Sequence, residues 1–139
     1  ILEMTRITEV PKSPDYMKGV INLRGTFFPV IDARLKFNLV EKEYTDLTCI
    51  IVLDLELDDE TINLGIIVDE VISVIEINDA QIEPPPQIGD RYKSDIVSGM
   101  AKADENFVMI LDMQKILADS EIHEITETAR KQKAEATNK

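Results

Sequence analysis

The single histidine and the single cysteine of this chain are the first candidates for chemistry, because a thiol and an imidazole together can form a nucleophilic pair. His123 lies near the C-terminus, whereas Cys49 opens a strongly apolar run, so they would meet only if the C-terminal segment folded back over that run. Cys49 is therefore predicted to be a small buried side chain rather than a reactive thiol. One nitrogen donor and one sulfur donor are also too few for a typical zinc site.

A second candidate is a cluster of carboxylates at one predicted hairpin, formed by Asp54, Glu56, Asp58, Asp59 and Glu60. Such a cluster could bind calcium, but it lacks the mid-loop glycine and the spaced terminal glutamate of a dedicated calcium loop. A solvated hairpin end explains the same charges. The five glycines are scattered, so no phosphate-binding loop is present. We expect no catalytic residues, no metal and no cofactor.

A metal-dependent hydrolase on a β-barrel stays open as a remote alternative. It would need Asp54, Asp58 and Asp59 to converge on an activated water.

The amino-acid composition limits the kinds of partner that this protein is expected to bind. The 139 residues are enough for one ordinary domain, and 44% of them are apolar, which is typical of a soluble globular protein. The 27 Asp and Glu against 15 Lys and Arg leave a net charge of −12. Such a field repels nucleic acid and anionic lipid, and no apolar run is long enough to insert into a membrane. The lone cysteine allows no internal disulfide, so we expect a cytoplasmic protein.

The elements that must position these residues are mostly short β-strands separated by turns. Many short strands with regular turn signals predict an all-β barrel or sandwich with minor helices. Helical turns are expected between Ser13 and Gly19 and at Asp32–Phe37, and no internal repeat is recognised. The predicted strands are Thr5–Val10, Val20–Leu23, Phe27–Ile31, Thr48–Leu57, Thr61–Val68, Val71–Ile77, Ile96–Lys102 and Phe107–Leu111.

The periodicity changes near the C-terminus. Asp119 or Ser120 can cap a helix in which Ile122, Ile125 and Ala129 share one face. Residues 119–139 are therefore predicted to be a C-terminal helical tail.

The segment Gly19–Phe37, GVINLRGTFFPVIDARLKF, combines two apolar runs with Arg24-Gly25 between them. Gly25 can take a positive φ in a tight turn, and Arg24 then presents a fork of donors at a strand end. Pro29 indicates an edge strand or a bulge.

This segment closely resembles the signature of the CheW-like domain of bacterial chemotaxis. Further stretches resemble the same family in its order and spacing, over about residues 1–118: LGIIVDEVISVIEI (Leu64–Ile77), IEPPP (Ile82–Pro86), IVSGMAK (Ile96–Lys102) and VMILDMQKIL (Val108–Leu117). The resemblance implies a CheW-like domain over residues 1–118, built of two small five-stranded SH3-like β-barrels packed side by side.

The resemblance also implies a non-catalytic adaptor that couples transmembrane chemoreceptors to the histidine autokinase CheA in signalling arrays. The partners would be the CheW-like regulatory domain of CheA and the cytoplasmic tip of the receptors, bound by a helix-in-groove contact. By motif position, the resemblance assigns receptor binding to Arg24, Cys49, Val74 and Asn22. It assigns contacts with the kinase or other partners to Lys18, Gly19, Gly25, Ile88 and Gly99.

The chain departs from the family at its start, because members begin with about two further strands before the region that matches Ile1. Without such strands we expect one sheet edge to be unpaired and apolar. A CheW-like domain cut from CheA, or from a CheV-type fusion with a phosphoacceptor domain, therefore remains an alternative to a free-standing adaptor.

Overall fold

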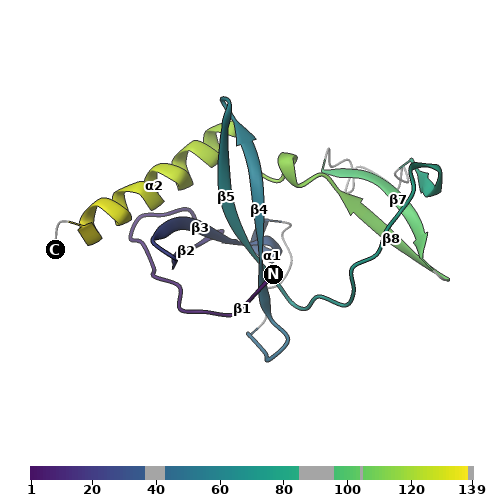
Figure 1. Cartoon of the computed structure of the whole chain (residues 1–139), viewed down its shortest axis with the longest axis horizontal. Helices are drawn as coiled ribbons and strands as arrows, with labels where there is room; N and C mark the ends of the chain where they lie inside the picture. The colour runs from purple at the N-terminus through teal and green to yellow at the C-terminus, as the bar shows by residue number, and fades with distance from the viewer. Residues whose placement is uncertain (37–42, 85–95, 104, 138–139) are drawn as a thin grey trace. The chain divides into compact units, whose positions relative to one another are not determined.

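A computed structural model describes residues 1–36, 43–84, 96–103 and 105–137, which form two compact units (Figure 1). The first unit contains residues 1–72 together with the C-terminal residues from Leu117, and the second contains Ser73–Ile116. Each unit has its own β-sheet, and the long C-terminal helix belongs to the first. The predicted fold class, mostly β with minor helices, is confirmed. Among the described residues, no helix is both long enough and apolar enough to span a bilayer.

The sheet of the first unit has five strands in the order β1-β4-β5-β3-β2. Neighbouring strands are antiparallel except for β3 and β5, which are parallel. The short helix α1 (Ala33–Lys36) follows β3 directly and lies within the helical turn predicted at Asp32–Phe37. The strands are β1 (Leu2–Glu3), β2 (Met17–Leu23), β3 (Thr26–Asp32), β4 (Cys49–Leu57) and β5 (Glu60–Val68).

Two tight hairpins shape this sheet. Asp58 and Asp59 join β4 to β5 with φ of 51° and 63°, and Arg24 and Gly25 join β2 to β3 with φ of 55° and 86°. Positive φ at both central residues matches the right-handed twist of the flanking strands. The positive φ predicted for Gly25 is confirmed, whereas the same conformation at Arg24 was not anticipated.

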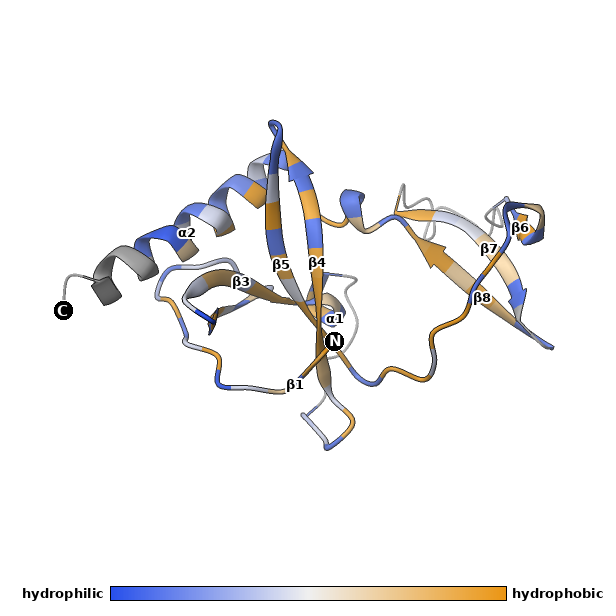
Figure 2. Cartoon of the chain, in the orientation of Figure 1, coloured by the Kyte–Doolittle hydropathy of each residue, from blue (hydrophilic) through white to orange (hydrophobic). Residues whose placement is uncertain are grey.

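The core of the first unit is closed by helix α2 (Asp119–Thr137), which contacts β3 and β2. Ile122, Ile125 and Ala129 are all buried, so the face predicted from their spacing is the one that packs. Hydrophobic and hydrophilic residues alternate along β4 and β5 toward their shared turn, as Figure 2 shows. This period of two is expected for strands with one face toward the core.

The sheet of the second unit has three strands within the described residues, in the order β6-β7-β8. A 3-10 turn lies at each end of this unit's described strands. The elements are η1 (Asp79–Gln81), β6 (Ile82–Glu83), β7 (Val97–Ala103), β8 (Asn106–Leu111) and η3 (Met113–Lys115).

Three local predictions were wrong. Thr5–Val10 makes only one isolated bridge, between Thr8 and Val20, and Met17–Gly19 already belong to β2 instead of closing a helical turn. Val71–Ile77 is not a strand, and most of its residues are exposed. A β-strand needs a neighbour that accepts its backbone hydrogen bonds, and propensity alone does not provide one.

Although the sequence shows no recognisable internal repeat, the two units contain the same hairpin at an offset of 80 positions. Strands β2 and β3 pair Met17 with Ile31 and then Gly19 with Val30 across a bulge. Strands β7 and β8 pair Val97 with Leu111 and then Gly99 with Ile110 across a bulge at the matching place. The remaining pairs of both hairpins follow the same register.

The repeat extends into the turn that follows each hairpin. The backbone N–H of Asp32 donates to Tyr16 O at 2.8 Å, and that of Asp112 donates to Ile96 O at 2.6 Å. The Asp32 carboxylate accepts from the backbone N–H of Arg34 at 2.9 Å, and the Asp112 carboxylate accepts from Gln114 at 3.1 Å. Few residue types coincide, so the sequence hides a repeat that the backbone geometry displays.

Candidate partner-binding surface

The turn between β2 and β3 brings together three of the predicted site residues. The Asn22 side-chain oxygen accepts a hydrogen bond from the backbone N–H of Gly25 at 2.9 Å, which closes the turn. Asn22, Arg24 and Gly25 are all exposed. The Arg24 guanidinium is thus carried at the tip of a short, hydrogen-bonded turn, where another protein can reach it.

Gly19 has a backbone role that the geometry explains. Its φ is 149°, and a Cβ added there would lie 2.1 Å from Thr8 O. Thr8 and Val20 exchange two backbone hydrogen bonds of 2.9 Å at this point. Gly19 therefore lets the segment before β2 cross directly against the strand, and it is buried rather than available for contact.

Lys18, at the bulge beside Gly19, lines a hollow of about 420 Å³ in the first unit. Aliphatic and aromatic groups form much of its wall, and Glu9 and Lys18 supply opposite charges. The complete lining is Met4, Thr5, Ile7, Glu9, Lys18 and Tyr44. Such a hollow can receive an apolar side chain flanked by polar groups.

Cys49 lies in β4, level with the end of β3 that is opposite the Arg24 turn. It is the first residue of β4 and pairs with Val68, while the neighbouring Ile67 pairs with Asp32 at the end of β3. Cys49 and the Arg24 turn are therefore separated by about the length of β3, which is roughly 20 Å. Cys49 is buried, as predicted. A partner that touched both residues would have to extend along the sheet.

The other predicted site residues belong to the second unit. Val74 is 86% exposed in a segment without helix or strand. Gly99 is buried in β7, where a Cβ would lie 2.7 Å from the Ile82 side chain and 2.9 Å from Glu83 O. It repeats the close approach seen at Gly19. Ile88 lies outside the described residues.

His123 and Cys49, the two residues that suggested a nucleophilic pair, do not lie together. His123 Nε2 lies 3.2 Å from Asp58 Oδ2 at the β4–β5 turn, whereas Cys49 begins the same strand β4 at its far end. Arg130 pairs with Glu60 at 3.2 Å, so helix α2 meets two of the carboxylates at this turn. Within the part of the chain that the structure describes, no three His, Cys, Asp or Glu side chains gather as metal ligands would.

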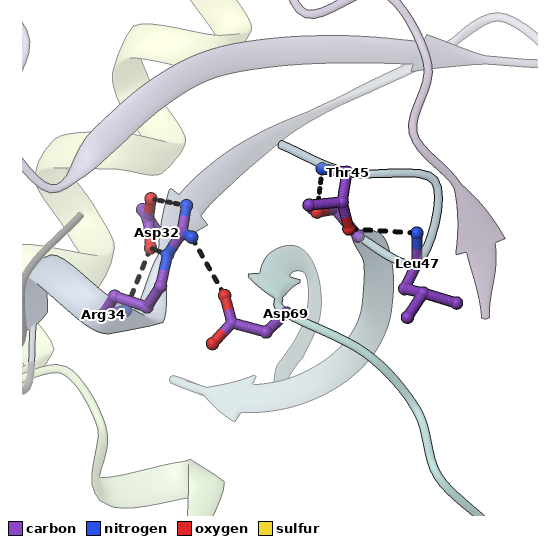
Figure 3. A network of polar contacts seen from close by, with 6 residues as sticks. Asp32, Arg34, Thr45, Leu47 and Asp69 are labelled. Carbon is purple, nitrogen blue, oxygen red and sulfur yellow. Dashed lines mark hydrogen bonds and ion pairs between the residues drawn. The ribbon is translucent and has the colours of Figure 1, made fainter. Parts of the chain in front are cut away.

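Among the described residues of the first unit, Arg34 forms a buried network with two carboxylates that sequence reasoning did not single out (Figure 3). Its Nε and Nη2 donate to the two Asp32 oxygens at 3.0 and 2.9 Å, and its Nη1 donates to Asp69 at 2.9 Å. Hydrogen bonds to Asp32 and the two carboxylate charges raise the pKa of Arg34, against the effect of burial. The signal in the sequence was an aspartate closing an apolar strand with an arginine two positions later.

A second polar cluster attaches the start of α2. Lys36 Nζ lies 2.6 Å from Glu121 Oε2 and 4.8 Å from the centre of the Tyr16 ring. Burial and the neighbouring Glu121 raise the pKa of Tyr16 to about 12. Burial opposes ionisation of Glu121, but hydrogen bonds from Lys36 and the Ala118 backbone outweigh it and lower the pKa of this carboxyl.

The comparison with protein families matches residues 1–121 to the CheW-like domain. The chain belongs to the CheW-like family. The match includes both repeated hairpins and the first turn of α2. The family expected from the Gly19–Phe37 motif is thereby confirmed.

Several chemotaxis proteins named CheW are similar to this CheW-like chain. The protein of Bacillus subtilis is 38% identical over 111 residues, which cover 79% of this chain and 68% of the relative. That of Klebsiella aerogenes is 30% identical over 125 residues, covering 90% of this chain and 73% of the relative. The solved scaffolding protein CheW of Thermoanaerobacter tengcongensis has a TM-score of 0.71 and 31% identity, over 84% of this chain and 73% of its own.

Proposed function

We propose that this CheW-like protein is a non-catalytic chemotaxis adaptor that couples transmembrane chemoreceptors to the histidine autokinase CheA. The names of its relatives and the scaffolding role named for the solved neighbour support this proposal. The protein would act in the cytoplasm, at arrays of receptors.

The observation that carries the proposal is the place of Arg24 within the match to the CheW-like domain, at the exposed tip of a β2–β3 turn that the Asn22 side chain closes. A non-glycine residue with φ of 55° is strained by about 1–2 kcal/mol, and a glycine or asparagine would relieve that strain. Arg24 nevertheless occupies the exposed tip of the hairpin. A side chain kept at such a position at a cost to folding is a candidate for binding. Its fork of donors suits carboxylates and backbone carbonyls at the end of a partner helix.

The receptor contact would include Arg24 and Asn22 at the β2–β3 turn of the first unit. Its predicted apolar positions are the buried Cys49 of the first unit and the exposed Val74 of the second. The kinase contact would use Lys18 and its hollow, together with Gly25 and Ile88. Gly19 and Gly99 would support these contacts through the backbone, because a side chain at either position would collide with the adjacent segment.

The test is co-sedimentation of the protein with CheA and a receptor cytoplasmic fragment. Arg24→Glu should weaken receptor binding about tenfold to a hundredfold, because charge-assisted hydrogen bonds are lost and like charges are brought together. Lys12→Glu is the matched control, since Lys12 is also exposed, cationic and left-handed, with φ of 62°. Wild-type binding by Arg24→Glu, or equal losses in the two variants, would contradict the assignment of Arg24.

A further inference from the structure

The sheet of the first unit leaves most of one edge of β4 open. Strand β1 pairs with β4 only at Cys49 and Ile50. Ile1, the next residue along that edge, lies outside the strand and is 70% exposed. The β4–β5 hairpin extends well beyond β1 to its turn (Figure 1). Beyond Ile50, the outer edge of β4 therefore has no neighbouring strand among the described residues.

The β4–β5 turn determines which backbone groups point toward this open edge. In a hairpin with a two-residue turn, the flanking residues form a hydrogen-bonded pair, which here is Leu57 with Glu60. Because such pairs alternate along antiparallel strands, every second residue of β4 counted back from Leu57 faces β5. Asp54 and Val52 fall between these residues, so their N–H and C=O groups point outward. Within the described part of the chain, no hydrogen bond reaches those outward groups.

The hairpin beside this edge is acidic. Residues 49–68 include five carboxylates and no lysine or arginine. His123 and Arg130 of helix α2 reach Asp58 and Glu60 near the turn. The Asp54 carboxylate is exposed, and no cation contacts it in the part of the chain that the structure describes. The edge thus offers free backbone groups next to an uncompensated negative charge.

A second copy of the chain is a poor occupant for this edge. If two β4 edges paired antiparallel about Asp54, the two Asp54 carboxylates would lie directly opposite each other. Like charges at such a position destabilise the pairing, whereas opposite charges stabilise it. The net charge of −12 further opposes the approach of two copies. Charge complementarity therefore favours a basic segment of another protein.

We propose that the outer edge of β4 at Val52 and Asp54 is a second docking surface, which takes an extended basic segment of a partner as an added antiparallel strand. Each of the two residues exchanges backbone hydrogen bonds with the partner residue opposite it. A lysine or arginine opposite Asp54 compensates its charge, and the alternate apolar residues of the partner lie beside the half-buried Ile51 and Leu53. Backbone pairing supplies affinity, and the alternating side chains supply specificity.

This surface goes beyond the proposed adaptor function. Strand β4 lies next to one end of the strand order, and the Arg24 turn joins β3 to β2 at the other end. The two surfaces can therefore be tested separately.

Short capped peptides test the β4 edge, with binding followed in ¹H–¹⁵N spectra of the full chain. One peptide alternates valine with lysine, and its control alternates valine with glutamate. The lysine peptide should shift the backbone amide signals of Val52 and Asp54, because their N–H groups gain partners, and the glutamate peptide should not. N-methylation of the peptide amides that face β4 should abolish these shifts. Unshifted signals at Val52 and Asp54, or equal binding of the two peptides, would overturn the inference.

Asp54→Asn should weaken binding of the lysine peptide about twofold to fivefold. Asp59→Asn is the matched control, because Asp59 is an exposed acid of the same hairpin whose φ of 63° asparagine tolerates. Equal losses in the two variants would show attraction to the acidic hairpin as a whole and would overturn the edge site. Dimerisation of the protein alone, with shifts at the same two amides, would overturn the choice of a basic partner. Receptor co-sedimentation should be unchanged in Asp54→Asn, and a loss there would contradict a surface separate from the Arg24 turn.

Discussion

Substitution of Gly19 by alanine separates a backbone role from a contact role at a position where the family resemblance predicts partner binding. The added Cβ would lie 2.1 Å from Thr8 O and 2.8 Å from Thr8 C, both backbone atoms that no rotamer change can move. The segment around Thr8 would have to leave β2. Both 2.9 Å hydrogen bonds between Thr8 and Val20 would then be lost.

The expected cost follows from these two effects. Holding alanine at φ of 149° costs about 1–3 kcal/mol, and each lost backbone hydrogen bond costs about 1 kcal/mol. The total of about 3–5 kcal/mol is a large part of the roughly 5–15 kcal/mol by which a domain is stable. Gly25→Ala is the matched control, because φ there is 86° but no atom lies within 4 Å of the added Cβ. It should cost only about 1–2 kcal/mol.

Urea unfolding followed by circular dichroism measures the difference. With a slope of about 1.5 kcal/mol per molar urea, Gly19→Ala should unfold at a midpoint about 2–3 M below that of the wild type. Gly25→Ala should unfold less than about 1.5 M below it. Equal midpoints for the two variants would refute the reasoning from the Thr8 crossing. Lost binding at full stability would instead indicate that Gly19 touches a partner.

Three further predictions concern charged residues. Arg24→Gly should raise the free energy of unfolding by about 1 kcal/mol in urea titrations while weakening receptor binding, whereas Lys12→Gly should give the first effect alone. Because the folded-state pKa of Glu121 is lowered, its contribution should be present above the ordinary glutamate pKa near 4.5 and lost as pH falls. Urea midpoints of wild type and Glu121→Gln should therefore differ at pH 7 and converge under acid. Arg34→Met should cost about 3–5 kcal/mol by thermal unfolding at pH 7, because it leaves the buried Asp32 carboxylate without its partner; a loss below about 1 kcal/mol would contradict that role.

Local patterns anticipated much of the first unit. The β4–β5 hairpin was readable because apolar and polar residues alternate on both sides of an acidic turn. The buried face of α2 was readable because Ile122, Ile125 and Ala129 have helical spacing. In both cases the information lies within a few neighbouring positions, where periodicity directly reflects which side faces the core.

Predictions that depended on distant partners were less successful. The apolar run Val71–Ile77 has strand propensity but no strand beside it within the described residues. Thr8 meets Val20 only because Gly19 leaves room for a close crossing. No local pattern contains either outcome, because each depends on a second segment brought near by the fold.

The sequence by itself determined the family, through the motif around Arg24-Gly25. Its net charge of −12 separately disfavours polyanionic partners. Only the tertiary structure revealed the repeated hairpin and the link from Arg34 to Asp69, which are 35 positions apart. A hydrogen bond between distant positions leaves no periodic trace in the chain, and a backbone register can persist after most of its side chains have changed. Both therefore become visible only when the chain is folded.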